Sequence, residues 1–166
     1  DWGRELVRHF EENSETGAIG IAGSNYKSNT YSGWYTGFAE QDAYNIMHIT
    51  HGKENPLVHY RTEKKDLYEA VCLDGVFIAS TKENWEAVRF NAEKLKGFHF
   101  YDLDFSIRTF LRGKKVWIWM DLNLEHLTIG GDFGTAWVKE ALLFHEYMKP
   151  LLPAGNIADS THEISI

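Results

Sequence analysis

The first stretch of the chain has the three-to-four-residue spacing of apolar side chains that is typical of an amphipathic helix. One face of a helix over residues 2–13 would carry Trp2, Leu6, Val7 and Phe10. Asp1 stands where an N-cap residue would stand. The segment "NSETG" then breaks the pattern, and the continuously apolar "AIGIAGS" at residues 18–24 predicts a short buried strand. Because the sequence begins directly at a helix and without Met, we expect it to be a fragment of a longer chain.

The middle of the chain alternates between loop-like and strand-like segments. Residues 25–45 are rich in Tyr, Asn, Ser and Gly, which is typical of loops and irregular strands. "PLVHYRTE" at residues 56–63 alternates like a strand, and "LYEAVCLDGVFIAS" at residues 67–80 predicts two strand halves around Asp74 and Gly75. These two residues either form a turn between the strand halves or place an acid in a binding crevice.

Two helices are predicted next. "TKENWEAV" at residues 81–88 is typical of a short helix, with Ser80 or Thr81 as its N-cap. A second helix is predicted at about residues 103–111, closed by Gly113 and the two lysines after it, which are helix stop signals.

The last third of the chain predicts one strand and one helix. "VWIWMDLNLEH" at residues 116–126 indicates a strand, and "TAWVKEALLFHEYM" at residues 135–148 indicates a helix. The buried side of that helix is expected to carry Trp137, Ala141, Leu142 and Phe144 or His145. The order of elements predicts an α/β fold class, with a mixed β-sheet flanked by helices in a single domain over residues 1–150 and a C-terminal tail at residues 151–166.

Composition narrows the classes of function. A net charge of -7 without a Lys/Arg-rich stripe argues against binding to nucleic acid phosphates or to an anionic membrane surface. The sequence contains no run of 18 apolar residues, so it predicts no transmembrane segment. The single cysteine, Cys72, lies in an apolar run, so we interpret it as a buried thiol rather than a nucleophile. It also leads us to expect a reducing, cytoplasmic compartment.

Two aspartates at the start of a predicted helix are candidates for chemistry. Asp102 stands where an N-cap would stand, and Asp104 falls in the first turn, where the helix dipole favours an acid. From spacing alone, these structural roles suffice. The preceding "GFHFYD" supplies an imidazole and flat aromatic faces that suit sugar rings or bases: Phe98, His99, Phe100 and Tyr101. Beside such a wall, a carboxylate could instead take a proton from an incoming hydroxyl group.

Other candidate residues carry weaker signals. His48 and His51 form an HxxH pair, but no CxxC or HExxH companion supports a zinc site. His126 ends a predicted strand before a Gly-rich loop, where it could contact a ligand or metal or simply close the strand. The aromatic residues Tyr31, Trp34 and Tyr35 could line a carbohydrate subsite or only pack together. "GAIGIAGSN" lacks the spacing and the lysine of a phosphate-binding P-loop.

The combined pattern is more specific than its parts. "LDGVFIAS", "KLKGFHFYDLDFSIRTFLRGKKVWI" and "LEHLTIGG" together resemble the second half of inverting, nucleotide-sugar-dependent glycosyltransferases of the family-2 type, which have a GT-A fold. The "GFHFYDLDF" variant is similar to the bacterial group labelled glycosyltransferase-like. The resemblance is good over roughly residues 67 to 130 and weaker over residues 2 to 34.

The resemblance implies roles for individual residues. Asp102 matches the general base for the acceptor hydroxyl, and Asp104 matches the acid that follows it. His126 matches a histidine near the metal and the diphosphate, and Asp74 and Gly75 match the strand that lines the sugars. With the aromatic wall, the expected substrate-binding residues are Trp34, Asp74, Gly75, Phe98, His99, Tyr101 and Asp104. The implied partners are a nucleotide sugar and a glycan or other hydroxyl acceptor, and the implied cofactor is a divalent metal, Mn or Mg.

Two departures from the family pattern shape the hypothesis. Tyr101 replaces the Glu of the family's Glu-Asp pair, which changes the polar support of the base. The family's nucleotide-binding half, with an Asp-x-Asp-like metal motif, normally precedes a helix like that of residues 2–13, and nothing in the sequence corresponds to it. We therefore expect the acceptor side of a transferase, with its metal held partly elsewhere. The alternatives are a non-catalytic carbohydrate-binding domain derived from that fold and a protein-interaction domain.

Overall fold

The computed structural model describes residues 1–35, 45–51, 57–59, 65–122, 124–127 and 133–155, and only the backbone at 45–51 and 57–59. Its helices are α1 (Trp2–Glu12), α3 (Lys82–Val88), α4 (Tyr101–Leu111) and α5 (Thr135–Met148), followed by the 3-10 turn η1 (Lys149–Leu151). The strands of the first half are β1 (Thr16–Gly20), β2 (Ala22–Ser24), β3 (Tyr26–Lys27), β4 (Asn45–His51) and β5 (Leu57–His59). The later strands are β6 (Leu67–Ala70), β7 (Cys72–Leu73), β8 (Ile78–Ser80), β9 (Lys115–Trp119), β10 (Glu125–His126) and β11 (Ala154–Gly155).

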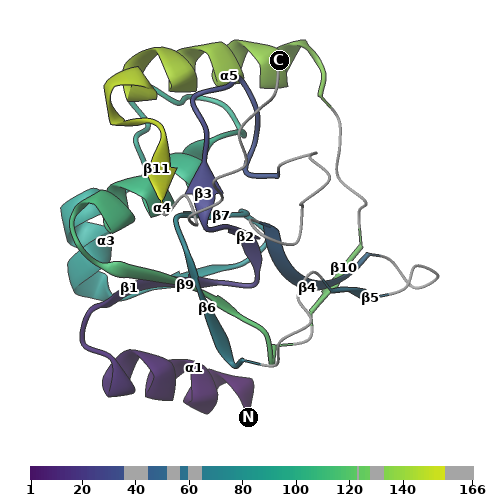
Figure 1. Cartoon of the computed structure of the whole chain (residues 1–166), viewed down its shortest axis with the longest axis vertical. Coiled ribbons are helices and arrows are strands. Elements are labelled where there is room, and N and C mark those ends of the chain that lie inside the picture. The colour runs from purple at the N-terminus through teal and green to yellow at the C-terminus, as the bar shows by residue number, and fades with distance from the viewer. Residues whose placement is uncertain (36–44, 52–56, 60–64, 123, 128–132, 156–166) are drawn as a thin grey trace, which may run out of the picture.

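The strands form a mixed α/β architecture with helices on both sides, as predicted (Figure 1). One sheet has the order β6-β9-β1-β8, in which β1 runs parallel to β9 and antiparallel to β8. A second sheet has the order β10-β4-β2-β7, and β5 pairs with β4. A third, two-stranded sheet joins β11 to β3, so residues 154 and 155 of the predicted tail are paired. Residues 156–166 lie outside the described residues.

Two predicted strands are each divided between two sheets. The apolar run at residues 18–24 breaks at Ile21, so that β1 and β2 belong to different sheets. The run at residues 116–126 likewise gives β9 in one sheet and β10 in the other. Ile21 is fully buried, so a continuous apolar run marks burial without showing where the chain changes sheets.

Helix α1 begins as predicted but buries a different side chain. The Asp1 carboxylate accepts a hydrogen bond from the Gly3 N–H at 3.1 Å, which confirms the N-cap. The predicted apolar face is largely exposed, however: Trp2 is 59% and Val7 53% exposed. His9 is instead the buried residue, because the helix meets the sheet where the His9 ring lies 5.3 Å from that of Trp119.

The other helices follow the sequence closely. Thr81 is confirmed as the N-cap of α3, since its hydroxyl accepts the Asn84 N–H at 3.1 Å. In α5, the predicted Ala141 and Phe144 are buried, whereas Leu142 is 52% exposed. The prediction for Leu142 was wrong because the buried row continues to Met148, and one residue of helix rotates a side chain by about 100° away from that row.

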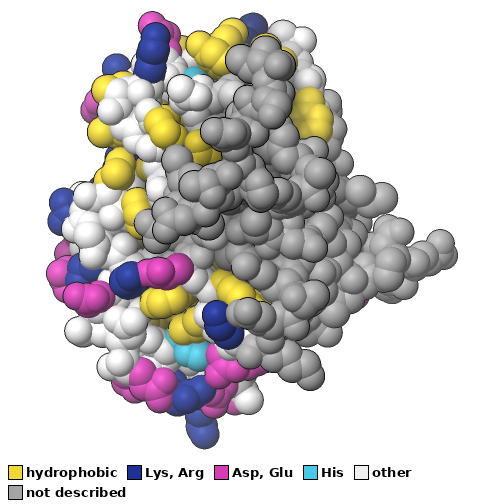
Figure 2. Space-filling view, in the orientation of Figure 1, with side chains coloured by type: hydrophobic (Ala, Val, Ile, Leu, Met, Phe, Trp, Pro, Cys, Tyr) yellow, Lys and Arg dark blue, Asp and Glu magenta, His cyan; other side chains and the backbone are white. Residues whose placement is uncertain are grey.

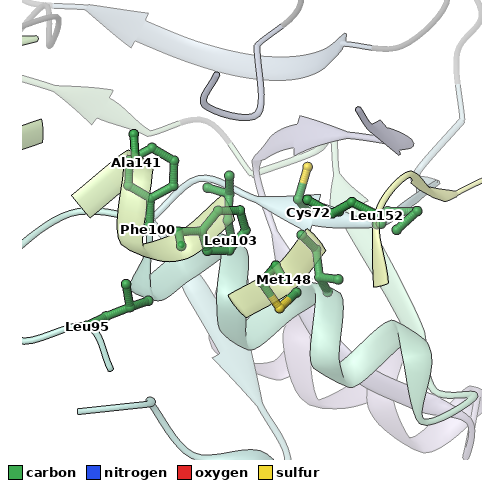
Figure 3. Close-up of a cluster of buried hydrophobic side chains, with 11 residues drawn as sticks. Cys72, Leu95, Phe100, Leu103, Ala141, Met148 and Leu152 are labelled. Atoms are coloured by element: carbon green, nitrogen blue, oxygen red, sulfur yellow. The ribbon is translucent and has the colours of Figure 1, made fainter. Parts of the chain in front are cut away.

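Helix α4 lies between the first sheet and α5. On the sheet side, Phe105 packs in a cluster with buried side chains of β1, β6 and β9. On the other side, Leu103 and Ile107 pack in a second cluster with Phe144 and Met148 of α5 (Figure 3). Both long sides of α4 are therefore fixed by packing, and its N-terminal turn is held in one place.

Cys72 belongs to the second cluster and is fully buried, as predicted. Burial raises the pKa of its thiol to about 12. A thiol with so high a pKa is almost entirely protonated at neutral pH and is a poor nucleophile.

Two further features are the distribution of charge on the surface and the polarity of the helices. In the coloured part of the face drawn in Figure 2, side chains of both charges are interspersed. Among the described residues, every helix is too short or too polar to cross a membrane.

Candidate functional site

The N-terminus of α4 differs from the prediction by two residues. Phe100, not Asp102, is the N-cap residue, and it makes no side-chain capping bond. Its φ of 66° lies in the left-handed region, which is uncommon for a large side chain and costs on the order of 1–3 kcal/mol. Packing holds it there, because the Phe100 ring stacks on Phe144 at 5.1 Å and lies 5.2 Å from Trp137. Asp102 consequently lies inside the first helical turn.

The Asp102 carboxylate bridges α4 and the turn between β7 and β8. Its Oδ2 accepts the Gly75 N–H at 2.8 Å, and its Oδ1 accepts the Leu103 N–H at 2.9 Å. A carboxylate has about four lone-pair positions, so two hydrogen bonds leave capacity on both oxygens. Asp74 and Gly75 lie in the short connection between β7 and β8, where the chain turns from Gly75 onward, in agreement with the predicted turn.

Asp102 has the proton affinity of a base that works near neutral pH. Burial, and then the nearby negative charge of Asp74, raises the pKa of Asp102 to about 7, while hydrogen bonds from Leu103 and Gly75 act in the opposite direction. General bases are most effective when their pKa lies close to the working pH. The surroundings of Asp102 therefore suit proton transfer at about pH 7.

Gly75 is required by the close approach of two side chains. A Cβ atom added at Gly75 would lie 2.3 Å from the Tyr101 hydroxyl oxygen and 3.2 Å from Asp102 Oδ2. Any side chain at this position would therefore force Tyr101 to move. Both oxygens lie near one point, so the Tyr101 hydroxyl is a polar neighbour of the Asp102 carboxylate.

Asp74 and Trp34 extend this arrangement. The Trp34 indole N–H donates to Asp74 Oδ2 at 2.6 Å, and the Val76 N–H donates to Asp74 Oδ1 at 2.8 Å. The structure thus brings together predicted residues from three separate segments. The indole N–H is the only hydrogen-bond donor of the Trp34 side chain and is used within the protein, so this side chain can offer a ligand only its ring face.

Asp104 lies in different surroundings from Asp102. It is fully buried, and its Oδ2 accepts hydrogen bonds from the Arg108 guanidinium, with Arg108 Nε at 2.9 Å. Its Oδ1 accepts the hydroxyl of Tyr147 in α5. Arg108 also donates to the Val88 and Arg89 carbonyls at the end of α3. The Asp104 carboxylate thus fastens α4 to its neighbours and faces away from solvent.

The loop before α4 exposes Phe98 and is anchored by a residue that the sequence did not indicate. Phe98 is 78% exposed. The backbone N–H of His99 donates to Glu140 Oε2 at 2.7 Å, and a Cβ at Gly97 would overlap the same carboxylate. Glu140 of α5 thereby holds the loop in place, a long-range contact for which the helical pattern of residues 135–148 gives no signal.

Lys27 is a second anchor that sequence reasoning missed. It is 1% exposed, and its Nζ donates to the Ser28 and Thr30 carbonyls at 2.8 and 3.1 Å and lies 3.1 Å from His145 Nε2. Burial lowers the pKa of Lys27 to about 8. These bonds tie the loop that leads to Trp34 to α5. A lysine in the polar "NYKSN" is typical of a surface loop, so its burial could not be expected.

His126 is the residue predicted to bind a metal. It lies in β10 beside β4, where it is in register with His51. The described residues contain no group of three or more His, Cys, Asp or Glu side chains that could hold a metal ion. The metal-binding role of His126 stays a prediction, and the side chains of the His48 and His51 pair lie outside the described residues.

Comparison with known proteins shows which family the chain is similar to. Residues 1–147 match the model of a family described as "Glycosyltransferase like family". The match spans all the residues described above as forming the site. No curated protein was found to match the chain.

Proposed function

Because the chain belongs to the glycosyltransferase-like family, we propose that Asp102 is the general base in transfer of a sugar from a nucleotide sugar to a hydroxyl acceptor. One observation carries the proposal: a carboxylate with a pKa of about 7 is fixed on a rigid helix and faces the Asp74-Gly75 turn. The family supports glycosyl transfer as the type of reaction, and the surroundings of Asp102 support its proposed role.

The proposed reaction is a single displacement with inversion. Asp102 takes the proton of the acceptor hydroxyl while the acceptor oxygen forms a bond to C1 of the donor sugar. The bond from C1 to the diphosphate oxygen breaks, and the nucleoside diphosphate leaves with the electron pair. Attack from the face opposite the leaving group inverts the configuration at C1.

The remaining predicted residues take supporting roles in this proposal. Asp74 raises the proton affinity of Asp102, and Gly75 fixes the position of the carboxylate. The ring faces of Trp34 and Tyr101 and the loop with Phe98 and His99 would contact the substrates. Asp104 would act only by holding α4, because its carboxylate is buried and bonded to Arg108 and Tyr147.

A divalent metal remains part of the expectation for this family. Mn²⁺ or Mg²⁺ would neutralise the charge of the leaving diphosphate. The described residues do not form a set of ligands for it, and no step proposed for Asp102 depends on it. If His126 is one of the ligands, His126→Ala should weaken the response of activity to added Mn²⁺ and leave the fold unchanged.

The test is a transfer and hydrolysis assay with a panel of UDP and GDP sugars in the presence of Mn²⁺ or Mg²⁺. Asp102→Asn should lower turnover by about 10²- to 10⁴-fold, the range typical of a lost general base, with donor binding retained. Asp121→Asn, at an exposed aspartate, is the matched control and should behave like the unaltered protein. Full turnover by Asp102→Asn would exclude Asp102 as the base.

A further inference from the structure

A second feature is a pocket that is lined in part by Tyr101, the residue before Asp102. The segment after α3 and the first residue of α4 line a pocket of about 560 Å³ that is open to solvent. Its lining includes Phe90, Leu95, Lys96, Phe98 and Tyr101. The Tyr101 ring lies 5.1 Å from Phe90 and 6.2 Å from Phe98, edge to face in both pairs. Three aromatic rings thus gather at one depression of the surface.

The exposure of these rings is unusual for side chains that serve only as core. Phe98 is 78% exposed and Phe90 is 43% exposed, whereas Leu95 beneath them is 5% exposed. The loop that presents Phe98 is nevertheless fixed, since the His99 N–H is bonded to the Glu140 carboxylate. Large apolar side chains that are held in place and left open to solvent mark binding sites.

Tyr101 connects this pocket to the proposed base. Its ring lines the pocket, and its hydroxyl oxygen would lie 2.3 Å from a Cβ at Gly75, the residue whose N–H binds Asp102. A molecule lying in the pocket would therefore continue, past Tyr101, toward the Asp102 carboxylate.

We propose that this pocket binds a second sugar ring of the acceptor, so that the acceptor is an oligosaccharide chain. The inference rests on the proposed function, because Asp102 marks where the reacting hydroxyl group must lie. The sugar unit that carries this hydroxyl group occupies the region beside Asp102, and the next unit of the same chain stacks on Phe98 and Tyr101.

The chemistry of the lining favours a sugar over a lipid chain. Sugar rings present C–H groups on their faces, which pack on aromatic rings, and hydroxyl groups at their edges, which need hydrogen-bond partners. Lys96 stands at the edge of the aromatic cluster, and within the described part of the chain its ammonium group makes no ion pair. It is thus available to donate to sugar hydroxyl groups, which a purely apolar chain would not use.

Binding of unmodified oligosaccharides tests this inference without any turnover. The probes are mono-, di- and tetrasaccharides of glucose, galactose, mannose and N-acetylglucosamine, measured by saturation-transfer NMR and calorimetry without a nucleotide sugar. We expect at least one disaccharide to bind at least tenfold more tightly than its monosaccharide. Phe98→Ala should weaken this binding at least tenfold, and Phe98→Trp should restore it.

Phe133→Ala is the matched control, because Phe133 is 67% exposed and lies outside the lining of the pocket. The inference is overturned if none of the saccharides binds, or if Phe98→Ala binds as tightly as the unaltered protein. The proposed function fails separately: turnover by Asp102→Asn would remove the base while leaving oligosaccharide binding at Phe98 intact. Conversely, transfer with an acceptor KM unchanged by Phe98→Ala would keep the base and remove the pocket.

Discussion

Asp102 and Asp104 stand two residues apart in the first turn of α4, yet their carboxylates lie in opposite kinds of surroundings. Asp102 faces the β7–β8 turn, where it meets the Gly75 N–H and the negative charge of Asp74, and it also accepts the Leu103 N–H of its own helix. Asp104 faces α5 and the end of α3, where it meets the Arg108 guanidinium and the Tyr147 hydroxyl. The first has a neighbour of like charge, and the second has a neighbour of opposite charge.

The difference shows that position on a helix does not determine what an acid does. Burial, together with the nearby negative charge of Asp74, favours the protonated form of Asp102. The partly buried guanidinium of Arg108 gives the buried Asp104 a structural role, because removing one member of such a pair leaves the other uncompensated. We therefore propose catalysis for Asp102 and a stabilising role for Asp104, although both carboxylates belong to the same turn.

The largest expected effect on stability comes from removing the Asp104 carboxylate. Asp104→Ala should lower the free energy of unfolding by about 2–4 kcal/mol, because the partly buried Arg108 guanidinium and the Tyr147 hydroxyl both lose the carboxylate that they bind. Urea denaturation measures this change. Asp121→Ala, at an exposed aspartate, should stay within about 0.5 kcal/mol of the unaltered protein. An equally small effect of Asp104→Ala would remove the structural role.

Asp102→Asn should raise the free energy of unfolding, whereas Asp104→Ala lowers it. A pKa raised from 3.8 to about 7 means that the folded state binds a proton more tightly than the unfolded state, so stability falls as the pH rises between these values. At pH 8 the asparagine variant should be more stable by about 1–3 kcal/mol, since it avoids a buried charge.

The pH dependence provides the control for that comparison. Below pH 3.8 Asp102 is neutral in both states, so the advantage of Asp102→Asn should disappear there. Thermal unfolding of the two proteins at pH 3.5 and pH 8 measures the difference. A variant that is less stable than the unaltered protein at pH 8 would contradict the assigned pKa.

The smallest expected effect comes from removing the negative charge of Asp74 next to Asp102. Asp74→Asn should lower the pKa of Asp102 from about 7 toward its ordinary range, because the second of the two causes that raise it is lost. The acid limb of the pH profile of kcat/KM should then move to lower pH. Asp66→Asn, at an exposed aspartate, should leave that limb in place. An unmoved limb in Asp74→Asn would show that Asp74 does not tune the base.

The sequence predicts the local structure of these regions better than their long-range contacts. Periodicity and capping residues locate α1, α3 and α5, and the Gly113 stop signal agrees with its φ of 79° after α4. The sheet change at Ile21 has no such signal, because all residues on either side of it are apolar or small and buried.

The candidate site shows the same limit. Aspartates at the start of a helix and the Asp74-Gly75 turn are visible in the sequence, and the family resemblance connects them. The bond from the Gly75 N–H to Asp102 spans 27 residues, and the left-handed backbone of Phe100 depends on the rings of α5. Lys27 and Glu140 have their roles because distant elements bury them, and this burial cannot be predicted from the local sequence pattern.

The most direct test of the account is the proton affinity of Asp102 itself. Carboxyl ¹³C NMR of the aspartates, with Asp102→Asn to assign the signal, measures the titration of this group. We expect a midpoint near pH 7 that is absent in the variant. A midpoint below pH 5 would contradict it, because Asp102 would then lack the raised proton affinity on which its role as a base depends.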